Sequence, residues 1–206
     1  QSGRNASELF SIYAAMQKLH TIDIISEIAG RNKSIKNFYL AAYHYVPQAL
    51  SDRSRLKIYS IKTYPLSNLK KRIRTIRIPK KWELGLASKV KMDNGEYYHI
   101  PQIDFTCPIS KCKLEIIKKR LLKIVKIFPG YILKTSKSYH YISLRLLNQK
   151  AWQRFIGSCL LCNMTGDESV VDARWFGYSL RCGFTNLRIF ATDLKYDPKV
   201  VMFLGK

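Results

Sequence analysis

GYILKTSKSYHYISLRLL is the sequence of residues 130–147, and this stretch does most to indicate the fold. Two segments rich in aromatic and β-branched side chains, 131–135 and 139–147, lie on either side of a Ser-Lys-Ser turn, a composition typical of strands. Ser138 and His140 are two residues apart, so their side chains lie on one face of the second strand. Hydroxyl and imidazole groups are suitable donors to phosphate oxygens, although a histidine in a tyrosine-rich strand is also commonly a packed residue.

Predicted strands and helices alternate on both sides of this stretch. A β-rich segment at 98–105 is followed by an apolar stripe at helical spacing over 114–128. After the stretch, the sequence predicts in turn a helix at 152–162, a short strand at 170–172, a helix at 175–181 and a strand at 186–192. This alternation predicts an α/β (α+β) fold, a mixed sheet flanked by helices.

The N-terminal part of the chain has a different pattern. Apolar residues recur at helical spacing from Leu9 to Ala29, and Gly30 is a typical helix stop. Residues 38–50 are rich in Tyr and Ala and predict a second helix. The expected organisation is a helical N-terminal segment (1–50), a basic β-rich stretch (51–96) and an α/β core (97–206), packed as one compact domain.

The composition indicates a folded protein with an anionic partner. Of 206 residues, 36 are Lys or Arg and 14 are Asp or Glu, which gives a formal net charge of +22, while 47% of the residues are apolar. The apolar content excludes disorder by composition, and no apolar run is long enough to cross a membrane. A surface of this charge favours nucleic acid or nucleotide phosphates as partners. We therefore expect an intracellular protein, in the cytoplasm or at the nucleoid, without membrane association.

Half of the net charge lies in one fifth of the chain. Residues 51–91 contain 13 basic and two acidic residues, a net charge of +11. From Arg72 to Ile78, basic residues alternate with β-branched ones, which predicts a strand with cations on one face. Such a face suits a phosphate backbone, although edge strands also use Lys and Arg to prevent aggregation. The residues expected to contact nucleic acid are Lys70, Lys71, Arg72, Arg74, Arg77, Lys80 and Lys81.

Acidic residues are scarce, so their positions are informative. Asp104, Asp172 and Asp193 each follow a short β-like segment. Carboxylates at strand ends can converge at one edge of a sheet, which is how Mg²⁺ or Mn²⁺ is held against nucleotide phosphates. Taken singly, each of these residues is also a common turn residue or helix N-cap.

The order of these features resembles the catalytic core of the archaeo-eukaryotic primase superfamily, which includes the primase-polymerases. The three motifs of that family are Asp-x-Asp, Ser-x-His and a hydrophobic residue followed by Asp. In this sequence Asp104 lies in the first motif, Ser138 and His140 form the second, and Asp172 ends the third. The resemblance covers residues 97–194, about half of the chain.

The resemblance implies a nucleotidyltransferase that binds DNA or RNA and nucleoside triphosphates with Mg²⁺ or Mn²⁺, alongside other replication or repair proteins. The implied catalytic residues are Asp104, Asp172 and His140, and the implied metal ligands are Asp104, Asp172 and Asp193. The residues implied to contact nucleotide are Ser138, His140, Lys137, Arg181 and Arg188.

One departure from the family pattern bears on activity. Thr106 stands where the first motif has its second carboxylate, and a hydroxyl cannot supply that charge. Either a remote carboxylate such as Asp93, Glu96 or Asp193 replaces it, or one metal is held weakly, or the site binds nucleotide without polymerising. A shifted register, with Asp193 in the third motif, is a further alternative. The alternative function is therefore a catalytically inactive nucleic-acid-binding protein of the same fold, working in a larger complex.

The five cysteines raise the question of a zinc site. Cys107 and Cys112 form one spaced pair, and Cys159 and Cys162 form another, within an apolar helical stretch. Buried thiols in a reducing compartment explain these residues more simply than zinc does. The sequence contains no glycine-rich dinucleotide loop, Walker loop or His-Glu-x-x-His helix.

Overall fold

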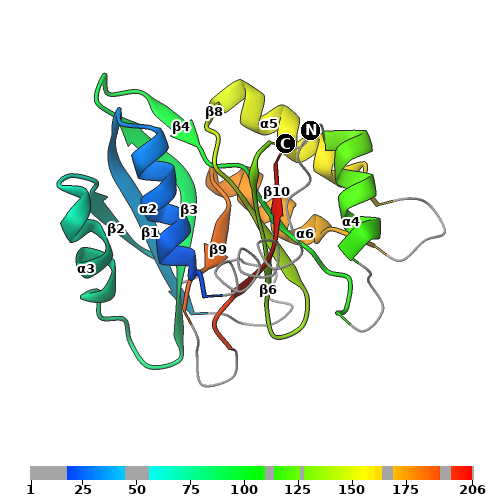
Figure 1. Ribbon diagram of the computed structural model, residues 1–206, viewed down its shortest axis with the longest axis horizontal. Helices are drawn as coiled ribbons and strands as arrows, with labels where there is room; N and C mark the ends of the chain where they lie inside the picture. Colours follow the sequence, from blue (N-terminus) through cyan, green and yellow to red (C-terminus); the bar gives the residue numbers. More distant parts are fainter. Residues whose placement is uncertain are drawn as a thin grey trace, which may run out of the picture.

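The protein folds into two antiparallel sheets with helices packed against them (Figure 1). The computed structural model describes residues 18–44, 56–109, 114–125, 128–163, 169–190 and 196–205. The mixed α/β (α+β) fold class predicted from the sequence is confirmed.

The first sheet, sheet A, carries helices on one of its faces. Its strand order is β2-β1-β3-β4-β8, with β9 paired to β3. The strands are β1 (Ile35–His44), β2 (Leu56–Lys62), β3 (Trp82–Met92), β4 (Tyr97–His99), β8 (Leu147–Asn148) and β9 (Asn186–Arg188). Helix α2 (Thr21–Arg31) lies over the sheet, and α3 (Leu69–Arg74), preceded by a 3-10 turn at Leu66–Asn68, lies at the β2 edge (Figure 1). Sheet A thus joins strands from all three predicted segments of the chain.

The second sheet, sheet B, is covered by the other helices. Its strand order is β10-β6-β7-β5. The strands are β5 (Gln102–Asp104), β6 (Gly130–Lys134), β7 (Tyr139–Ser143) and β10 (Lys199–Leu204). The helices are α4 (Leu114–Arg120), which continues as a π-helical turn over Leu121–Val125, α5 (Gln149–Leu160) and α6 (Ala173–Cys182). Trp152 and Phe176 are fully buried between these helices and the sheet, in a core cluster separate from that under α2.

The predicted second N-terminal helix is wrong where the structure describes it. Residues 35–44 form β1, which pairs with both β2 and β3, while 45–50 lie outside the described residues. Phe38, Leu40 and Ala42 are fully buried at alternate positions and Ala41 between them is buried too, so pairing with strands on both sides, rather than burial alone, makes this segment a strand. Of the first predicted helix, 9–17 lie outside the described residues, 18–20 are not helical, and the rest is present in α2. The predicted stop at Gly30 is wrong, because Gly30 lies inside α2 and Asn32 is its C-cap.

The predicted cationic strand at 72–78 is also wrong. Leu69–Arg74 forms α3, whose two buried side chains, Leu69 and Ile73, are four residues apart and face α2. Basic residues between apolar ones fit a short amphipathic helix as well as a strand, and packing of the two apolar residues against α2 selects the helix.

A buried polar network links β3 and β4 of sheet A to the N-terminus of α5. The backbone N–H of Thr185 donates to Ser88 Oγ (3.0 Å), which lies 3.2 Å from His99 Nδ1, and His99 Nε2 lies 2.8 Å from Gln149 Oε1. The imidazole stacks on Trp152, with 4.3 Å between ring centroids. Burial lowers the pKa of His99 from 6.5 to about 4. The folded protein therefore holds His99 neutral at neutral pH.

Acid should destabilise the fold through His99. Its pKa is lower in the folded than in the unfolded chain, so the unfolded chain binds the extra proton as pH falls below 6.5. The neutral imidazole's contribution is complete above pH 6.5 and is lost progressively toward pH 4. We expect the free energy of unfolding to fall between pH 7 and 5 by about 2 kcal/mol more in the wild type than in His99→Gln, measured by urea denaturation. Equal pH dependence of the two proteins would contradict this assignment.

Candidate active site

Three predicted motif residues lie in one row across sheet B. β5 and β7 pair Asp104 with His140. On the other side of β5, Phe105 bridges Val171, and the N–H of Asp172 donates to the carbonyl oxygen of Asp104 at 3.1 Å. Directly opposed residues of antiparallel strands present their side chains on the same face. His140, Asp104 and Asp172 therefore come from segments far apart in the sequence to one face.

Two residues of this row, His140 and Asp104, are in contact. His140 Nε2 lies 3.5 Å from Asp104 Oδ1, and the two side chains are 9% and 28% exposed. The imidazole is thus nearly buried, while the carboxylate reaches the surface. A ligand can approach Asp104 from solvent while His140 forms the wall of the site.

Asp172 has a structural role in the same place. Its Oδ1 accepts a hydrogen bond from the N–H of Trp175 (3.0 Å), which caps the N-terminus of α6. A carboxylate has two oxygens and about four acceptor positions, so capping by one oxygen leaves capacity for a second ligand. Both sequence interpretations of Asp172, helix cap and site residue, are compatible with this position.

Arg188 lies against the row as a buried cation. It is 5% exposed, and its Nη1 donates to the carbonyl oxygens of Phe190 and Tyr196, each at 2.6 Å. Burial lowers the pKa of the guanidinium, and the surrounding groups that act in the opposite direction are Glu83, Tyr43, Asp197 and Asp104. The sequence predicted a phosphate contact for Arg188; the structure buries its guanidinium, bonds it to the backbone, and gives it a favourable electrostatic interaction with Asp104.

Two acidic residues near Arg188 were missed by sequence reasoning. Glu83 is buried on β3 and accepts a hydrogen bond from Tyr43 Oη at 2.9 Å, and Asp197 lies in the segment before β10. One signal was available for Glu83, since it is one of two acids among the 13 basic residues of 51–91. An acid placed between basic residues in such a stretch suggests an internal partner for a buried arginine.

The other predicted nucleotide contacts occupy different positions. Ser138 is half-buried in the turn before β7, where its N–H donates to Thr135 Oγ1, and Lys137 is exposed in the same turn. Arg181 is exposed in the last turn of α6, nine residues from Asp172, or about 14 Å along the axis. Asp193 lies outside the described residues.

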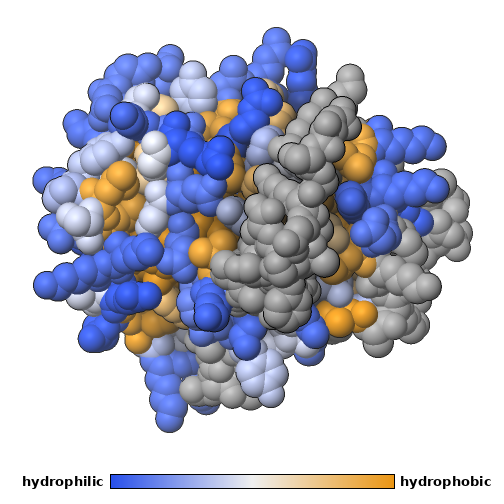
Figure 2. All heavy atoms as spheres, in the orientation of Figure 1, coloured by the Kyte–Doolittle hydropathy of each residue, from blue (hydrophilic) through white to orange (hydrophobic). Residues whose placement is uncertain are grey.

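The predicted nucleic-acid contacts lie around α3, at the β2 edge of sheet A. Figure 2 shows hydrophilic side chains projecting at this edge of the molecule. Lys70 Nζ lies 2.6 Å from Asp23 Oδ1, and Arg72 donates to the carbonyl oxygen of Lys62 at 2.7 Å, so both have partners within the protein. The exposed members of the set are Lys71, Arg74, Arg77, Lys80 and Lys81.

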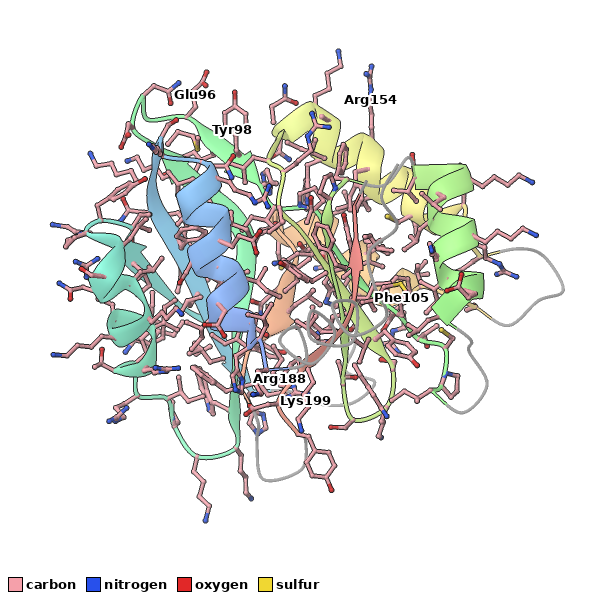
Figure 3. The ribbon with its side chains drawn as sticks, in the orientation of Figure 1. Glu96, Tyr98, Phe105, Arg154, Arg188 and Lys199 are labelled. Atoms are coloured by element: carbon pink, nitrogen blue, oxygen red, sulfur yellow. The ribbon has the colours of Figure 1, made fainter. Side chains whose placement is uncertain are left out.

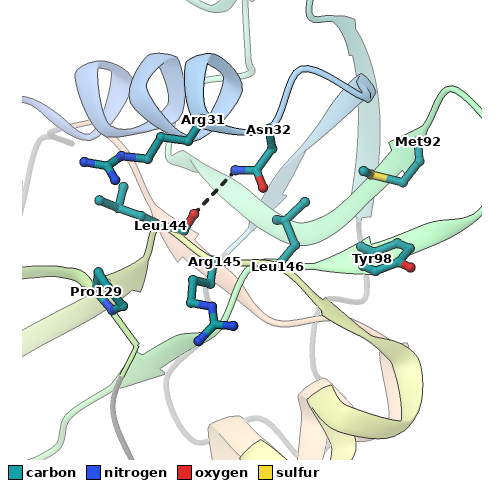
Figure 4. Close-up of a pocket in the computed structure, with 8 residues that line it drawn as sticks. All are labelled: Arg31, Asn32, Met92, Tyr98, Pro129, Leu144, Arg145 and Leu146. Atoms are coloured by element: carbon teal, nitrogen blue, oxygen red, sulfur yellow. Dashed lines mark hydrogen bonds between the residues drawn. The ribbon is translucent and has the colours of Figure 1, made fainter. Parts of the chain in front are cut away.

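A separate pocket of about 610 Å³ lies near the opposite end of β7 from His140. Figure 4 shows Arg31 and Arg145 at its rim and Tyr98 on the β4 side. Asn32 spans it by donating to the carbonyl oxygen of Leu144 at 3.4 Å. None of the predicted motif residues lines this pocket.

Comparison with known proteins gives a match to one family. A family model described as AEP-like, archaeo-eukaryotic primase 1D-like, matches residues 62–201. The chain belongs to this family. The match begins in β2 and ends in β10, so this primase-like family covers most of both sheets and not only the second half of the chain. No curated protein and no solved structure matches.

The candidate site has donors suited to a hard divalent cation, and proteins of this fold typically use divalent metals. Mg²⁺ is often bound through one or two carboxylates together with water and substrate phosphates, which fits Asp104 opposed to Asp172. Among the described residues, no group of three or more His, Cys, Asp and Glu is placed to hold a metal ion without such help.

No carboxylate of the β3–β4 turn takes the place of the second carboxylate that the first motif lacks. Thr106 is exposed, and its N–H donates to the carbonyl oxygen of Val170. Asp93 and Glu96 lie in that turn, and Figure 3 places Glu96 at the opposite end of the molecule from Phe105 and Arg188. Two of the three remote carboxylates considered from the sequence are thus distant from this primase-like site.

Of the described cysteines, Cys107, Cys159 and Cys162 are buried, whereas Cys182 is exposed. Burial raises the pKa of the Cys159 thiol well above its ordinary value and that of Cys162 to about 11. Zinc binds thiolates, so a raised thiol pKa disfavours a zinc site at this pair. Cys112 lies outside the described residues.

No described helix is long and apolar enough to span a membrane.

Proposed function

We propose that this primase-like protein is a nucleotidyltransferase that extends a nucleic-acid strand on a template from nucleoside triphosphates. The observation that supports this most directly is the row of His140, Asp104 and Asp172, because it brings residues of all three family motifs to one face.

Each residue of the row has a distinct chemical task. Asp104 and Asp172 would hold a divalent metal, Mg²⁺ or Mn²⁺, which supplies positive charge to the transferring phosphate when bound. His140 positions Asp104 from the buried side of the row and, with Ser138 and Lys137, offers donors to the triphosphate. The buried guanidinium of Arg188 offsets the negative charge of Asp104, and burial strengthens this electrostatic effect.

The exposed basic residues around α3 are proposed to bind the nucleic-acid backbone, of DNA or RNA. Neutralising Lys71, Arg74 and Lys80 to Gln should weaken binding and lower the slope of log K against log salt by about one for each phosphate that is no longer neutralised. The measurement is a salt titration of oligonucleotide affinity. Lys36→Gln, an exposed cation on β1, is the control and should leave the slope within half a unit. An unchanged slope in the triple variant would show that nucleic acid binds elsewhere.

Thr106 favours the second candidate function, an inactive nucleic-acid-binding protein acting within a larger complex, which includes other replication or repair proteins. Incorporation of a labelled nucleotide onto a primed template, with Mg²⁺ or Mn²⁺ present, separates the two functions. Template-dependent extension supports the nucleotidyltransferase. Oligonucleotide binding without extension, under conditions in which an established polymerase extends the same primer, would favour the inactive protein instead.

A further inference from the structure

The face of sheet A that points away from α2 carries a pair of tyrosines. Phe38 and Leu40 of β1 are buried toward α2, so Tyr39 between them points to the opposite face. There its ring lies 6.4 Å from that of Tyr97 on β4, at an interplanar angle of 41°. Tyr97 is 42% exposed. Two aromatic rings from different strands are therefore presented together at the surface.

Cations accompany these rings on the same face. Lys89 Nζ lies 4.1 Å above the ring of Tyr97, well within the range of a cation–π contact. Lys91 is paired directly with Tyr97 in the β3–β4 ladder, so both side chains lie on this face. Positive charge is thus held beside the tyrosine rings on a stiff support.

Polar and apolar groups of β2 extend this surface. Ser60 lies opposite Tyr39 in the β1–β2 ladder, and Asn37 Nδ2 donates to Ser60 Oγ at 3.0 Å. Ile58, the next residue on the same face of β2, is 44% exposed. Together with Lys89 of β3, the surface therefore offers rings, an aliphatic side chain, an amide and a hydroxyl over the four neighbouring strands β2, β1, β3 and β4. We call Tyr39, Tyr97, Lys89, Ile58 and Ser60 the tyrosine platform.

The tyrosine platform lies on the face of sheet A that leads to the candidate active site. Tyr43, four residues along β1 from Tyr39, lies opposite Glu83 on β3 and donates to its carboxylate. Arg188 is near both groups, and it is also near Asp104. A ligand on the platform thus lies on the same side of the sheet as the buried cation of the site.

We propose that the tyrosine platform binds single-stranded nucleic acid, with bases stacked on Tyr39 and Tyr97 and phosphates contacted by Lys89 and Lys91. Aromatic rings next to cations, with little base-specific hydrogen bonding, are the means by which proteins hold single strands. A duplex has its bases stacked internally and cannot use the rings. The role of this strand as the template rests on the proposed function, whereas the binding itself does not.

The test is the affinity of fluorescently labelled oligonucleotides, measured by anisotropy, with single-stranded DNA, single-stranded RNA and duplex DNA as separate arms. Tyr97→Leu and Tyr39→Leu should each weaken single-strand binding about five- to tenfold or more, because each removes a stacking surface. Tyr97→Trp should preserve the affinity. Lys89→Gln should lower the salt slope by about one. A difference between the DNA and RNA arms identifies the natural strand.

Tyr59→Leu is the matched control, because Tyr59 lies on the opposite face of β2 with Lys57 Nζ 5.1 Å from its ring. It should change the affinity less than twofold. Wild-type affinity in both Leu variants, or an equal loss on duplex DNA, would overturn the proposal. Failure of the platform is distinguishable from failure of the proposed function. If Tyr97→Leu weakens binding but the wild type never extends a primer, the platform is supported and the proposed enzyme activity is not. If the wild type extends a primer and Tyr97→Leu binds with undiminished affinity, the activity is supported and the platform is not.

Discussion

Asp104→Asn is expected to reduce nucleotide incorporation at least about a hundredfold, equivalent to about 2.7 kcal/mol of transition-state stabilisation. The substitution keeps the shape of the side chain but removes the charge from the centre of the row formed with His140 and Asp172. Charge at the reacting phosphate is the main requirement of phosphoryl transfer, so the loss should appear in the rate of the chemical step. Single-turnover extension of a labelled primer measures that rate.

Asp93→Asn, in the β3–β4 turn, is the matched control for this experiment. It removes the same charge at the end of the molecule away from the site, and it should leave the rate within about twofold. Asp104→Asn should also retain oligonucleotide affinity, since the tyrosine platform and the basic residues around α3 are intact. Equal rates for Asp104→Asn and the wild type would exclude Asp104 from the reaction.

Arg188→Met is expected to lower the free energy of unfolding by about 3–5 kcal/mol, the range found when one partner of a buried charge cluster is removed. The buried guanidinium interacts electrostatically with Glu83, Asp197 and Asp104, which would lose that favourable interaction. The carbonyl oxygens that accept from Arg188 would also lose their donor. Urea denaturation monitored by circular dichroism measures the change.

Arg181→Met is the comparison for Arg188→Met, because Arg181 is exposed on α6 and its loss should cost less than about 0.5 kcal/mol. Arg188→Lys should fall between the two, since it keeps the charge but replaces the planar guanidinium, whose Nη1 donates to two carbonyl oxygens, with a shorter side chain of different geometry. A loss below about 1 kcal/mol for Arg188→Met would mean that the cluster does not need its central cation.

The parts of the fold with strong local signals were predictable from the sequence. Helices α5 and α6 have amphipathic patterns and polar N-caps, and β6 and β7 flank a clear turn, so local spacing specifies each of them. The three motif residues could be named for the same reason, since each lies in or at the end of a short β-like segment.

The predictions of secondary structure were wrong where packing between elements overrides the local sequence pattern. β1 is rich in Tyr and Ala, which alone do not distinguish a strand from a helix, and pairing on both sides decides the outcome. The segment Leu69–Arg74 has two apolar residues that fit either period, and contact with α2 selects the helix. In both cases the deciding partners come from other elements of the chain.

The charge cluster around Arg188 could not be predicted, because its members are distant in the sequence. Glu83 and Asp104 come from strands of different sheets, and Arg188 reaches both only after β9 pairs with β3. The sequence named Asp104 and Arg188 as separate contacts to ligand. Their proximity to each other depends on the topology of two sheets.

The most direct test of the proposed active site is anomalous diffraction from crystals of the protein soaked with Mn²⁺ and a non-hydrolysable nucleoside triphosphate. We predict a manganese peak bound by the carboxylates of Asp104 and Asp172, with the triphosphate directed toward His140 and Ser138. Asp104→Asn crystals treated identically should lose the peak. A manganese–nucleotide complex bound at another place, such as the pocket beside Arg31 and Arg145, would contradict the assignment of this row as the active site.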